Sequence, residues 1–209
     1  LPARSEMCIR DSIDVGWVGG VSAGASHVVN YLSRDIQRSI NSFTDFIAQP
    51  DSSGWRPMLR GRGYFDAEYI YEDAGLPDGA MPLDYETFKN NPTPYRISAV
   101  RADTGETINW GPDDIPDLPT LMKYTSASST IPGVMRMPYI DGVPFVDGAL
   151  GSSGGIPINA AEADGFKKFL IVLTRPKGFR RTAPKRPQLL RQIFRSNPVV
   201  AEPVSYTHL

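Results

Sequence analysis

The stretch that most constrains the fold of this sequence is the pentapeptide Gly20-Val21-Ser22-Ala23-Gly24, a Gly-x-Ser-x-Gly motif. Residues 13–18 before it are apolar and β-branched, which predicts a buried strand, and residues 25–32 after it predict a helix. A sharp strand–turn–helix exposes the serine hydroxyl, and Gly20 and Gly24 avoid clashes that a Cβ would cause. The helix N-terminus favours negative charge at the serine. The motif therefore indicates a nucleophile at Ser22, with an ordinary glycine-rich turn as the alternative.

The rest of the chain alternates strand and helix patterns. A continuous apolar run at 169–173 predicts a strand buried on both faces. These patterns predict an α/β fold of three layers, α/β/α, with a mostly parallel central sheet, in one domain over residues 13–203. Residues 1–12 and 204–209 show no period, and we expect them to be non-native ends. The other predicted strands are 95–101, 106–110, 137–140 and 143–146, and the other helices are 67–74, 84–90, 115–126, 158–163, 187–195 and one starting near 35.

Composition excludes several classes of protein. A net charge of -1 gives no electrostatic case for binding nucleic acid. The single cysteine, Cys8, excludes an internal disulfide and a cysteine metal cluster, and we expect no metal or cofactor. Without an apolar run of membrane-spanning length or a signal-peptide pattern, we expect a cytoplasmic or peripherally membrane-associated protein. Arg60 and Arg62, in a loop over 49–63, and a basic stretch at 175–186 are most simply solvated; contact with an anionic membrane surface is the alternative.

A serine nucleophile needs a group that takes its proton, and neither histidine is well placed. His27 lies more than one turn into the helix after the motif, so its side chain is expected to point away from the Ser22 hydroxyl. His208 follows an aspartate in the chain order of α/β-hydrolases, but it is next to last in the C-terminal tail. A Ser-His-Asp esterase using His208 is therefore a minority interpretation.

Asp147 is the best candidate for the base. It ends a hairpin strand and precedes glycines at 148, 151, 154 and 155, which let the backbone approach a ligand closely. If desolvation raised its pKa, an aspartate within hydrogen-bond reach of the serine could accept the proton directly. The alternative is a plain turn aspartate, and Asp103 and Asp14 are weaker rivals for the role.

Three stretches together resemble the bacterial patatin-like phospholipases. They are the segment 20–25 around Ser22, the segment 126–133 (Ser-Ala-Ser-Ser-Thr-Ile-Pro-Gly), which is similar to the family's Ala-Ser-x-Ala-x-Pro, and Val146-Asp147-Gly148-Ala149, which is similar to its Asp-Gly-Gly/Ala motif. The resemblance covers about residues 14–174 and implies a patatin-like fold with a Ser–Asp dyad and no histidine. It implies that Ser22 is the nucleophile and Asp147 the base of an acyl hydrolase acting on lipid esters.

One motif of that family has no counterpart here. Its members carry a glycine-rich oxyanion loop, Gly-Gly-Gly-x-Arg/Lys-Gly, after an earlier strand, and Gly16 and Gly19 do not supply it. The N–H of Ala23 remains as one oxyanion donor. We therefore expect a fragment that is incomplete at the N-terminus and weakly active or inert, since loss of one donor costs on the order of 10²–10³ in rate.

The leading hypothesis is a phospholipase A or esterase-like serine hydrolase that acts on a lipid or other ester, with peripheral membrane contact as an open alternative. Two alternatives stay open. One is an impaired fragment or pseudoenzyme that binds lipid or a protein partner, and the other is the esterase that uses His208.

Overall fold

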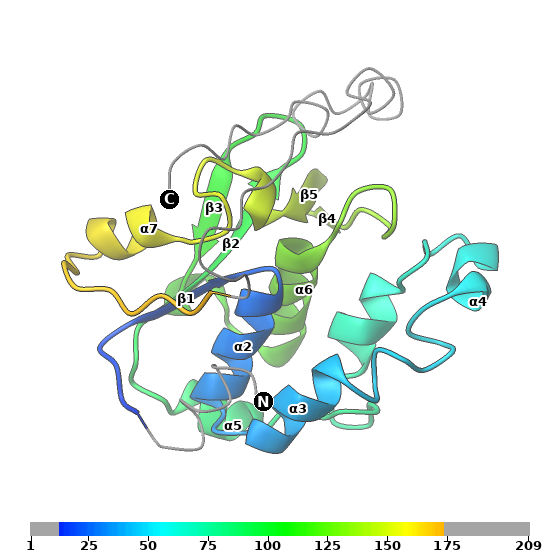
Figure 1. Ribbon diagram of the computed structural model, residues 1–209, viewed down its shortest axis with the longest axis horizontal. Helices are drawn as coiled ribbons and strands as arrows, with labels where there is room; N and C mark the ends of the chain where they lie inside the picture. The colour runs from blue at the N-terminus through cyan, green and yellow to red at the C-terminus, as the bar shows by residue number, and fades with distance from the viewer. Residues whose placement is uncertain (1–12, 174–209) are drawn as a thin grey trace.

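A five-stranded sheet built on β2 (Tyr95–Arg101) forms the centre of the protein in the computed structural model, which describes residues 13–173 (Figure 1). β1 (Val18–Val21) pairs with β2 in parallel. β3 (Thr107–Trp110) and β5 (Val143–Asp147) pair with it antiparallel, and β4 (Tyr139–Ile140) extends the sheet beyond β5. β2 is therefore the strand on which the positions of the others depend.

The register places β1 and β5 end to end. β3 pairs with residues 97–100 of β2 and so occupies one edge of that strand. β1 pairs with residues 95–98 and β5 with 99–101, which leaves both of them on the opposite edge. They run toward each other, because one is parallel and the other antiparallel to β2. Their last residues, Val21 and Asp147, lie opposite Ser98 and Ala99.

The α/β class is confirmed, while the sheet is parallel only in part. Among the described strands, only the β1–β2 pair is parallel. The other pairs include two hairpins with short connections, through residues 102–106 and 141–142, and such short connections force antiparallel pairing. Both hairpins are predicted from the sequence. Because each of them forms an antiparallel pair, the sheet is less parallel than predicted.

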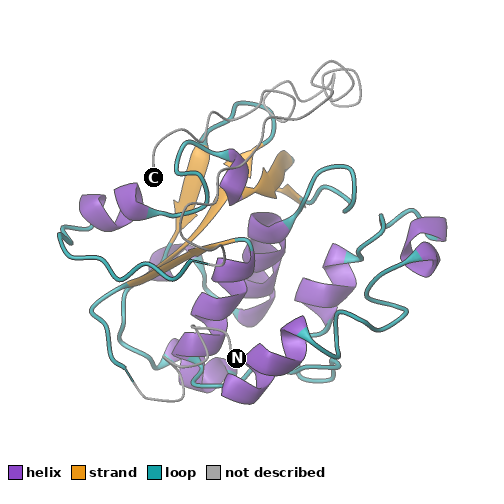
Figure 2. Cartoon of the chain, in the orientation of Figure 1, coloured by secondary structure: helices purple, strands orange, loops and turns teal. Residues whose placement is uncertain are grey.

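Helices cover both faces of this sheet. α2 (Ala23–Leu32) and α6 (Leu118–Ser129) pack on one face, and α7 (Ile158–Ala163) lies on the other (Figures 1 and 2). A Cβ on Gly20 would lie 2.1 Å from the Gly24 carbonyl oxygen of α2, whereas a Cβ on Gly19 would lie 3.0 Å from Pro157, just before α7. Successive residues of a strand point to opposite faces, so β1 is held between two helical layers.

The remaining helical elements lie around α2 and α6 or at the edge of the sheet, except α4, which lies at the margin of the molecule (Figure 1). They are α3 (Ile36–Phe43), α4 (Trp55–Leu59), the π-helix η1 (Glu68–Asp73), α5 (Tyr85–Lys89) and the 3₁₀ turns η2 (Pro112–Asp114) and η3 (Gly148–Leu150). Aspartates cap the N-termini of three helices: Asp35 accepts from the N–H of Arg38, Asp84 from that of Thr87 and Asp117 from that of Thr120.

The main core lies between the sheet and its α2/α6 layer. It joins apolar side chains of α2, β2, α6 and β5 with those of the connecting segments. Its buried members are Ala25, Val28, Val29, Tyr31, Leu32, Leu83, Phe88, Tyr95, Ile97, Ala99, Trp110, Ile115, Leu121, Met122, Ala127, Ile140 and Phe145. The single domain over 13–203 stays a prediction, because residues 174–203, including the helix expected at 187–195, lie outside the described range.

Two expected strands are wrong in whole or in part. Residues 13–17 are not in a strand, and β1 begins only at Val18. Residues 169–173 have no strand pairing, and all five side chains are exposed, Leu170 by 72%. An apolar run indicates a segment that gains from burial, but it does not supply the neighbouring strand that burial requires.

We predict that Leu121→Ala lowers the free energy of unfolding by about 2–5 kcal/mol, because Leu121 is completely buried between α6 and the sheet and truncation leaves a cavity. Urea unfolding monitored by circular dichroism measures the change. Leu59→Ala is the matched control: Leu59 is 75% exposed, so its truncation should change stability by less than about 0.5 kcal/mol.

Candidate active site

Ser22 occupies a strained turn between β1 and α2. Its backbone has φ 58° and ψ -127°, a combination that side-chain-bearing residues rarely adopt. The strand must turn into the helix here without room for a Cβ at Gly20, as the 2.1 Å approach to the Gly24 carbonyl shows. The expectation that Gly24 is needed for the same reason is wrong, since a Cβ there would meet nothing within 4 Å. The turn leaves the Ser22 side chain partly exposed.

Asp147 lies beside that serine at the end of β5. The Ser22 hydroxyl donates a hydrogen bond to Asp147 Oδ2 at 2.6 Å. The other carboxylate oxygen, Oδ1, accepts from the N–H of Ala149 at 2.8 Å. Asp147 is buried, with 7% of its surface exposed, and its backbone N–H donates a hydrogen bond to the carbonyl of Thr130. One carboxylate oxygen is thus oriented by the backbone while the other faces the hydroxyl.

The sheet register explains why these two residues meet. Ser22 follows the last residue of β1, and Asp147 is the last residue of β5. Since the two strands run head to head along one edge of β2, their C-terminal ends converge at Ser98 and Ala99. A serine and an aspartate separated by 125 positions in the chain are brought within hydrogen-bond distance in this way.

Ser128 of α6 holds the turn at Ser22 through hydrogen bonds. The sequence alone did not indicate this role. Its Oγ accepts from the backbone N–H of Ser22 at 3.0 Å and donates to the carbonyl of Ser98 at 2.7 Å. Ser128 is completely buried near the end of α6. It therefore ties the serine turn to β2 and α6 together. Its position within the family-like segment 126–133 was the available signal, but that segment contains several similar serines.

The rival bases lie elsewhere. His27 stacks on Phe43 with ring centroids 4.8 Å apart, and its Nδ1 is 3.2 Å from Ser39 Oγ. Asp14 forms an ion pair with Arg34, and Asp103 forms one with Arg101. His208 lies outside the described residues. Of the described candidates, Asp147 is the one that contacts the Ser22 hydroxyl.

The N-terminus of α2 provides the electrophilic side of the site. Ala23 is the first residue of the helix, directly after Ser22. Backbone N–H groups of a first helical turn lack partners within the helix and carry the positive end of the helix dipole. The N–H of Ala23 therefore belongs to a region that stabilises negative charge next to the serine hydroxyl.

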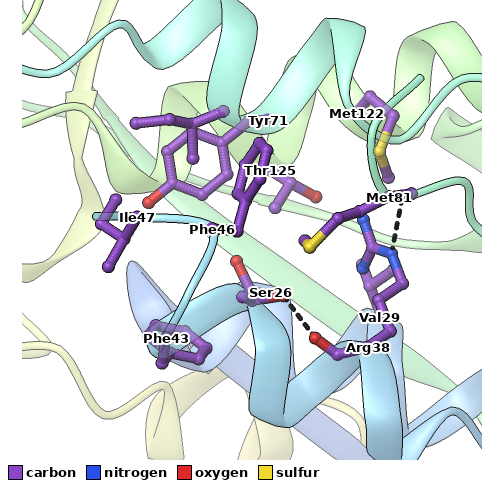
Figure 3. A pocket seen from close by; sticks show the side chains of 12 residues that line it. Ser26, Val29, Arg38, Phe43, Phe46, Ile47, Tyr71, Met81, Met122 and Thr125 are labelled. Atoms are coloured by element: carbon purple, nitrogen blue, oxygen red, sulfur yellow. Dashed lines mark hydrogen bonds between the residues drawn. The ribbon is translucent and has the colours of Figure 1, made fainter. Parts of the chain in front are cut away.

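A small apolar cavity lies one helical turn away from these groups. It has a volume of about 50 Å³ and lies between α2, α3, η1 and α6 (Figure 3). Ser26, one turn after Ser22, and Thr125, one turn before Ser129, contribute to its wall. Apolar lining comes from Val29, Phe43, Phe46, Ile47, Ile70, Met81 and Met122.

Tyr71 of η1 connects the cavity with the Ser22–Asp147 pair. Its ring lines the cavity, and its hydroxyl interacts electrostatically with the Asp147 carboxylate. Burial raises the pKa of the Tyr71 hydroxyl, against a hydrogen bond with Ser129, and the charge of Asp147 raises it further. Burial also raises the pKa of the neighbouring Glu72 carboxyl, against a hydrogen bond with Ser126.

Two kinds of feature were not found within residues 13–173. In this range, no three or more His, Cys, Asp or Glu side chains are grouped as metal ligands would be. None of the helices in the same range has the length and apolar character needed to cross a membrane.

Comparison with known proteins adds a family. Residues 10–161, more than half of the chain, match the family model described as Patatin-like phospholipase. A comparison with curated protein sequences gives no match. The matched range contains the serine turn, the Ser128 bridge and Asp147.

We predict that Ser128→Ala weakens the turn at Ser22. The change removes the acceptor for the Ser22 N–H and the donor to Ser98, both buried, which should cost about 1–3 kcal/mol of stability. Chemical unfolding of both proteins measures this cost. Ser129→Ala, the change one residue along the same helix, is the comparison, since Ser129 Oγ faces the Tyr71 hydroxyl rather than the backbone of Ser22. Equal losses for both variants would contradict a special role for Ser128.

Proposed function

Because the chain belongs to the patatin-like phospholipase family, which is a family of lipid acyl hydrolases, we propose that it hydrolyses lipid acyl esters with Ser22 as nucleophile and Asp147 as general base. The observation that carries the proposal is the 2.6 Å hydrogen bond from Ser22 Oγ to Asp147 Oδ2, formed at a strained turn before a helix N-terminus. A candidate base must lie within about 2.6–3.2 Å of the atom that carries the proton, and the 2.6 Å between Ser22 Oγ and Asp147 Oδ2 supports this role.

In the first half of the proposed reaction, Ser22 Oγ attacks the ester carbonyl carbon while its proton moves to Asp147 Oδ2. The carbonyl oxygen becomes an oxyanion, which the N–H of Ala23 and the N-terminus of α2 stabilise. The tetrahedral intermediate then collapses: the bond to the alkoxy oxygen breaks, and the alcohol leaves with the proton from Asp147. An acyl group remains on Ser22.

In the second half, a water molecule attacks the acyl carbon. Asp147 accepts one proton from that water and returns it to Ser22 Oγ as the acyl–serine bond breaks, so the free acid leaves and both residues are restored. The hydrogen bond from the Ala149 N–H to Oδ1 keeps the carboxylate oriented through both halves. Ser128 acts as a positioning residue, because it holds the backbone of Ser22 rather than the reacting atoms.

We assign the end of the acyl group to the cavity beside Tyr71. Its wall is mainly apolar and reaches to within one helical turn of Ser22. Its volume of about 50 Å³ is well below the ~150 Å³ of a cavity that admits benzene. In the conformation described, the cavity therefore accepts only a short acyl segment, and longer chains require its side chains to move.

We predict that Ser22→Ala abolishes ester hydrolysis and labelling by a fluorophosphonate probe. Asp147→Asn keeps the shape of the side chain but removes its basicity, so kcat should fall by on the order of 10²–10⁴. Hydrolysis of p-nitrophenyl butyrate and probe labelling measure both effects. If Asp147→Asn retained most of the activity, the proposed base would be wrong.

His27→Gln is the control for this pair of variants. His27 packs against Phe43 and Ser39 rather than Ser22, so its replacement should leave kcat within a few-fold. Removal of residues 204–209 tests the alternative esterase that uses His208. A loss of activity comparable to that of Ser22→Ala would support a histidine-dependent reaction instead.

We predict opposite shifts in acyl-chain preference for two substitutions of Ile47, a partly buried cavity residue. Ile47→Ala enlarges the cavity and should raise kcat/KM for octanoate relative to acetate esters, whereas Ile47→Phe fills it and should lower this ratio. One methylene in an apolar pocket changes discrimination by about 10–200-fold, so shifts of at least about tenfold are expected. An unchanged chain-length profile in both variants would exclude this cavity as the acyl site.

A further inference from the structure

A group of exposed apolar side chains surrounds α4, far from the main core. Trp55 is 64% exposed and Leu59 75%, and Met58 and Tyr64 are exposed as well. Ile131, exposed on a loop that contacts this segment, extends the group. We call these five residues the α4 patch. Contiguous exposed apolar area of this kind marks interaction sites on proteins.

Arginines accompany the apolar residues of the α4 patch. Residues 54–64 contain three arginines and no acidic residue. The Arg56 guanidinium lies 5.9 Å from the ring centroid of Trp55. Arg60 is exposed and reaches Asp51 at 3.2 Å. Arg62 forms ion pairs with Asp66 and Glu68, so the cationic group that most directly accompanies the exposed apolar side chains is Arg56, beside Trp55.

The backbone around α4 holds this surface in place. The N–H of Gly54 donates to the Tyr64 carbonyl at 2.8 Å, and the N–H of Asp66 donates to the Ser52 carbonyl at 3.0 Å, which closes the loop at its base. Pro57, in the middle of α4, is completely buried. α4 itself lies at the margin of the ribbon (Figure 1).

Further contacts join the α4 loop to the candidate active site. The N–H of Phe65 donates to the Val134 carbonyl, and Gly63 approaches Val134 so closely that a Cβ would lie 2.6 Å from that oxygen. The loop that contains Val134 begins at Ile131, directly after Thr130, whose carbonyl accepts from the N–H of Asp147. The α4 patch therefore continues to within one residue of the backbone that supports Asp147.

We propose that the α4 patch docks the protein onto an anionic phospholipid bilayer. The role of such docking rests on the proposed lipid hydrolysis, whereas the binding itself rests on the patch. Tryptophan and tyrosine favour the interface between headgroups and acyl chains, Met58 and Leu59 add apolar area, and arginines are complementary to anionic lipid phosphates. Docking at this place would set the loop 131–134, which follows the backbone that supports Asp147, against the bilayer.

Co-sedimentation with vesicles tests the proposal. The protein is mixed with vesicles of phosphatidylcholine alone or with 30% phosphatidylglycerol, a proportion chosen on the order of that in anionic membranes. We expect stronger binding to the anionic vesicles. Trp55→Ser combined with Leu59→Ser should weaken it by about tenfold or more, and Arg56→Gln with Arg60→Gln by about fivefold per arginine. Tyr139→Ser is the matched control, because Tyr139 is an exposed aromatic residue outside the patch.

The outcomes separate this proposal from the proposed function. Ser22→Ala should bind vesicles as the parent protein does, and the Trp55/Leu59 double variant should keep its activity on a soluble p-nitrophenyl ester while losing activity on vesicles. Equal vesicle binding by the parent and the double variant, or no binding by the parent, would overturn the proposal. So would self-association of the parent, seen by light scattering, that the double variant abolishes.

Discussion

The pairing of β1 and β5 with the same edge of β2 is the constraint on which the candidate site depends. β1 arrives in parallel and β5 antiparallel, so both end at the middle of β2, opposite Ser98 and Ala99. Neither strand needs to bend to bring Ser22 and Asp147 together. The Ser98 carbonyl also accepts a hydrogen bond from the Ser128 hydroxyl, which in turn accepts one from the Ser22 N–H. The serine turn, the end of α6 and the central strand therefore meet at one point.

Strain at Ser22 is tolerated because the surroundings determine its backbone from three sides. The β1–β2 pairing fixes the residues before it, helix α2 fixes those after it, and Ser128 binds its N–H. Strained backbone of this kind costs on the order of 1–3 kcal/mol and persists where packing overdetermines it. In return, the hydroxyl is directed toward Asp147, where the proposed chemistry takes place.

Much of the fold could be predicted from sequence, because many elements carry local signals. Strand β2 and helix α7 begin and end where their patterns predicted. Ser22 and Asp147 stand in short motifs, so their selection needed no knowledge of the sheet. Ser128 could not be selected among its neighbouring serines, because its role depends on β2 passing beneath it. The prediction of a buried strand at 169–173 was wrong for a related reason. The partners of a strand are set by tertiary pairing, which apolar character alone does not encode.

The convergence of β1 and β5 has a consequence for the moment at which activity can first appear. The proposed nucleophile and base are 125 positions apart, and neither is useful until β2 has paired with both strands. A ribosome that has released only the serine turn and β2 has therefore made a chain without its base. The proposed reaction therefore requires that the chain through Asp147 has been made and that β5 has paired with β2.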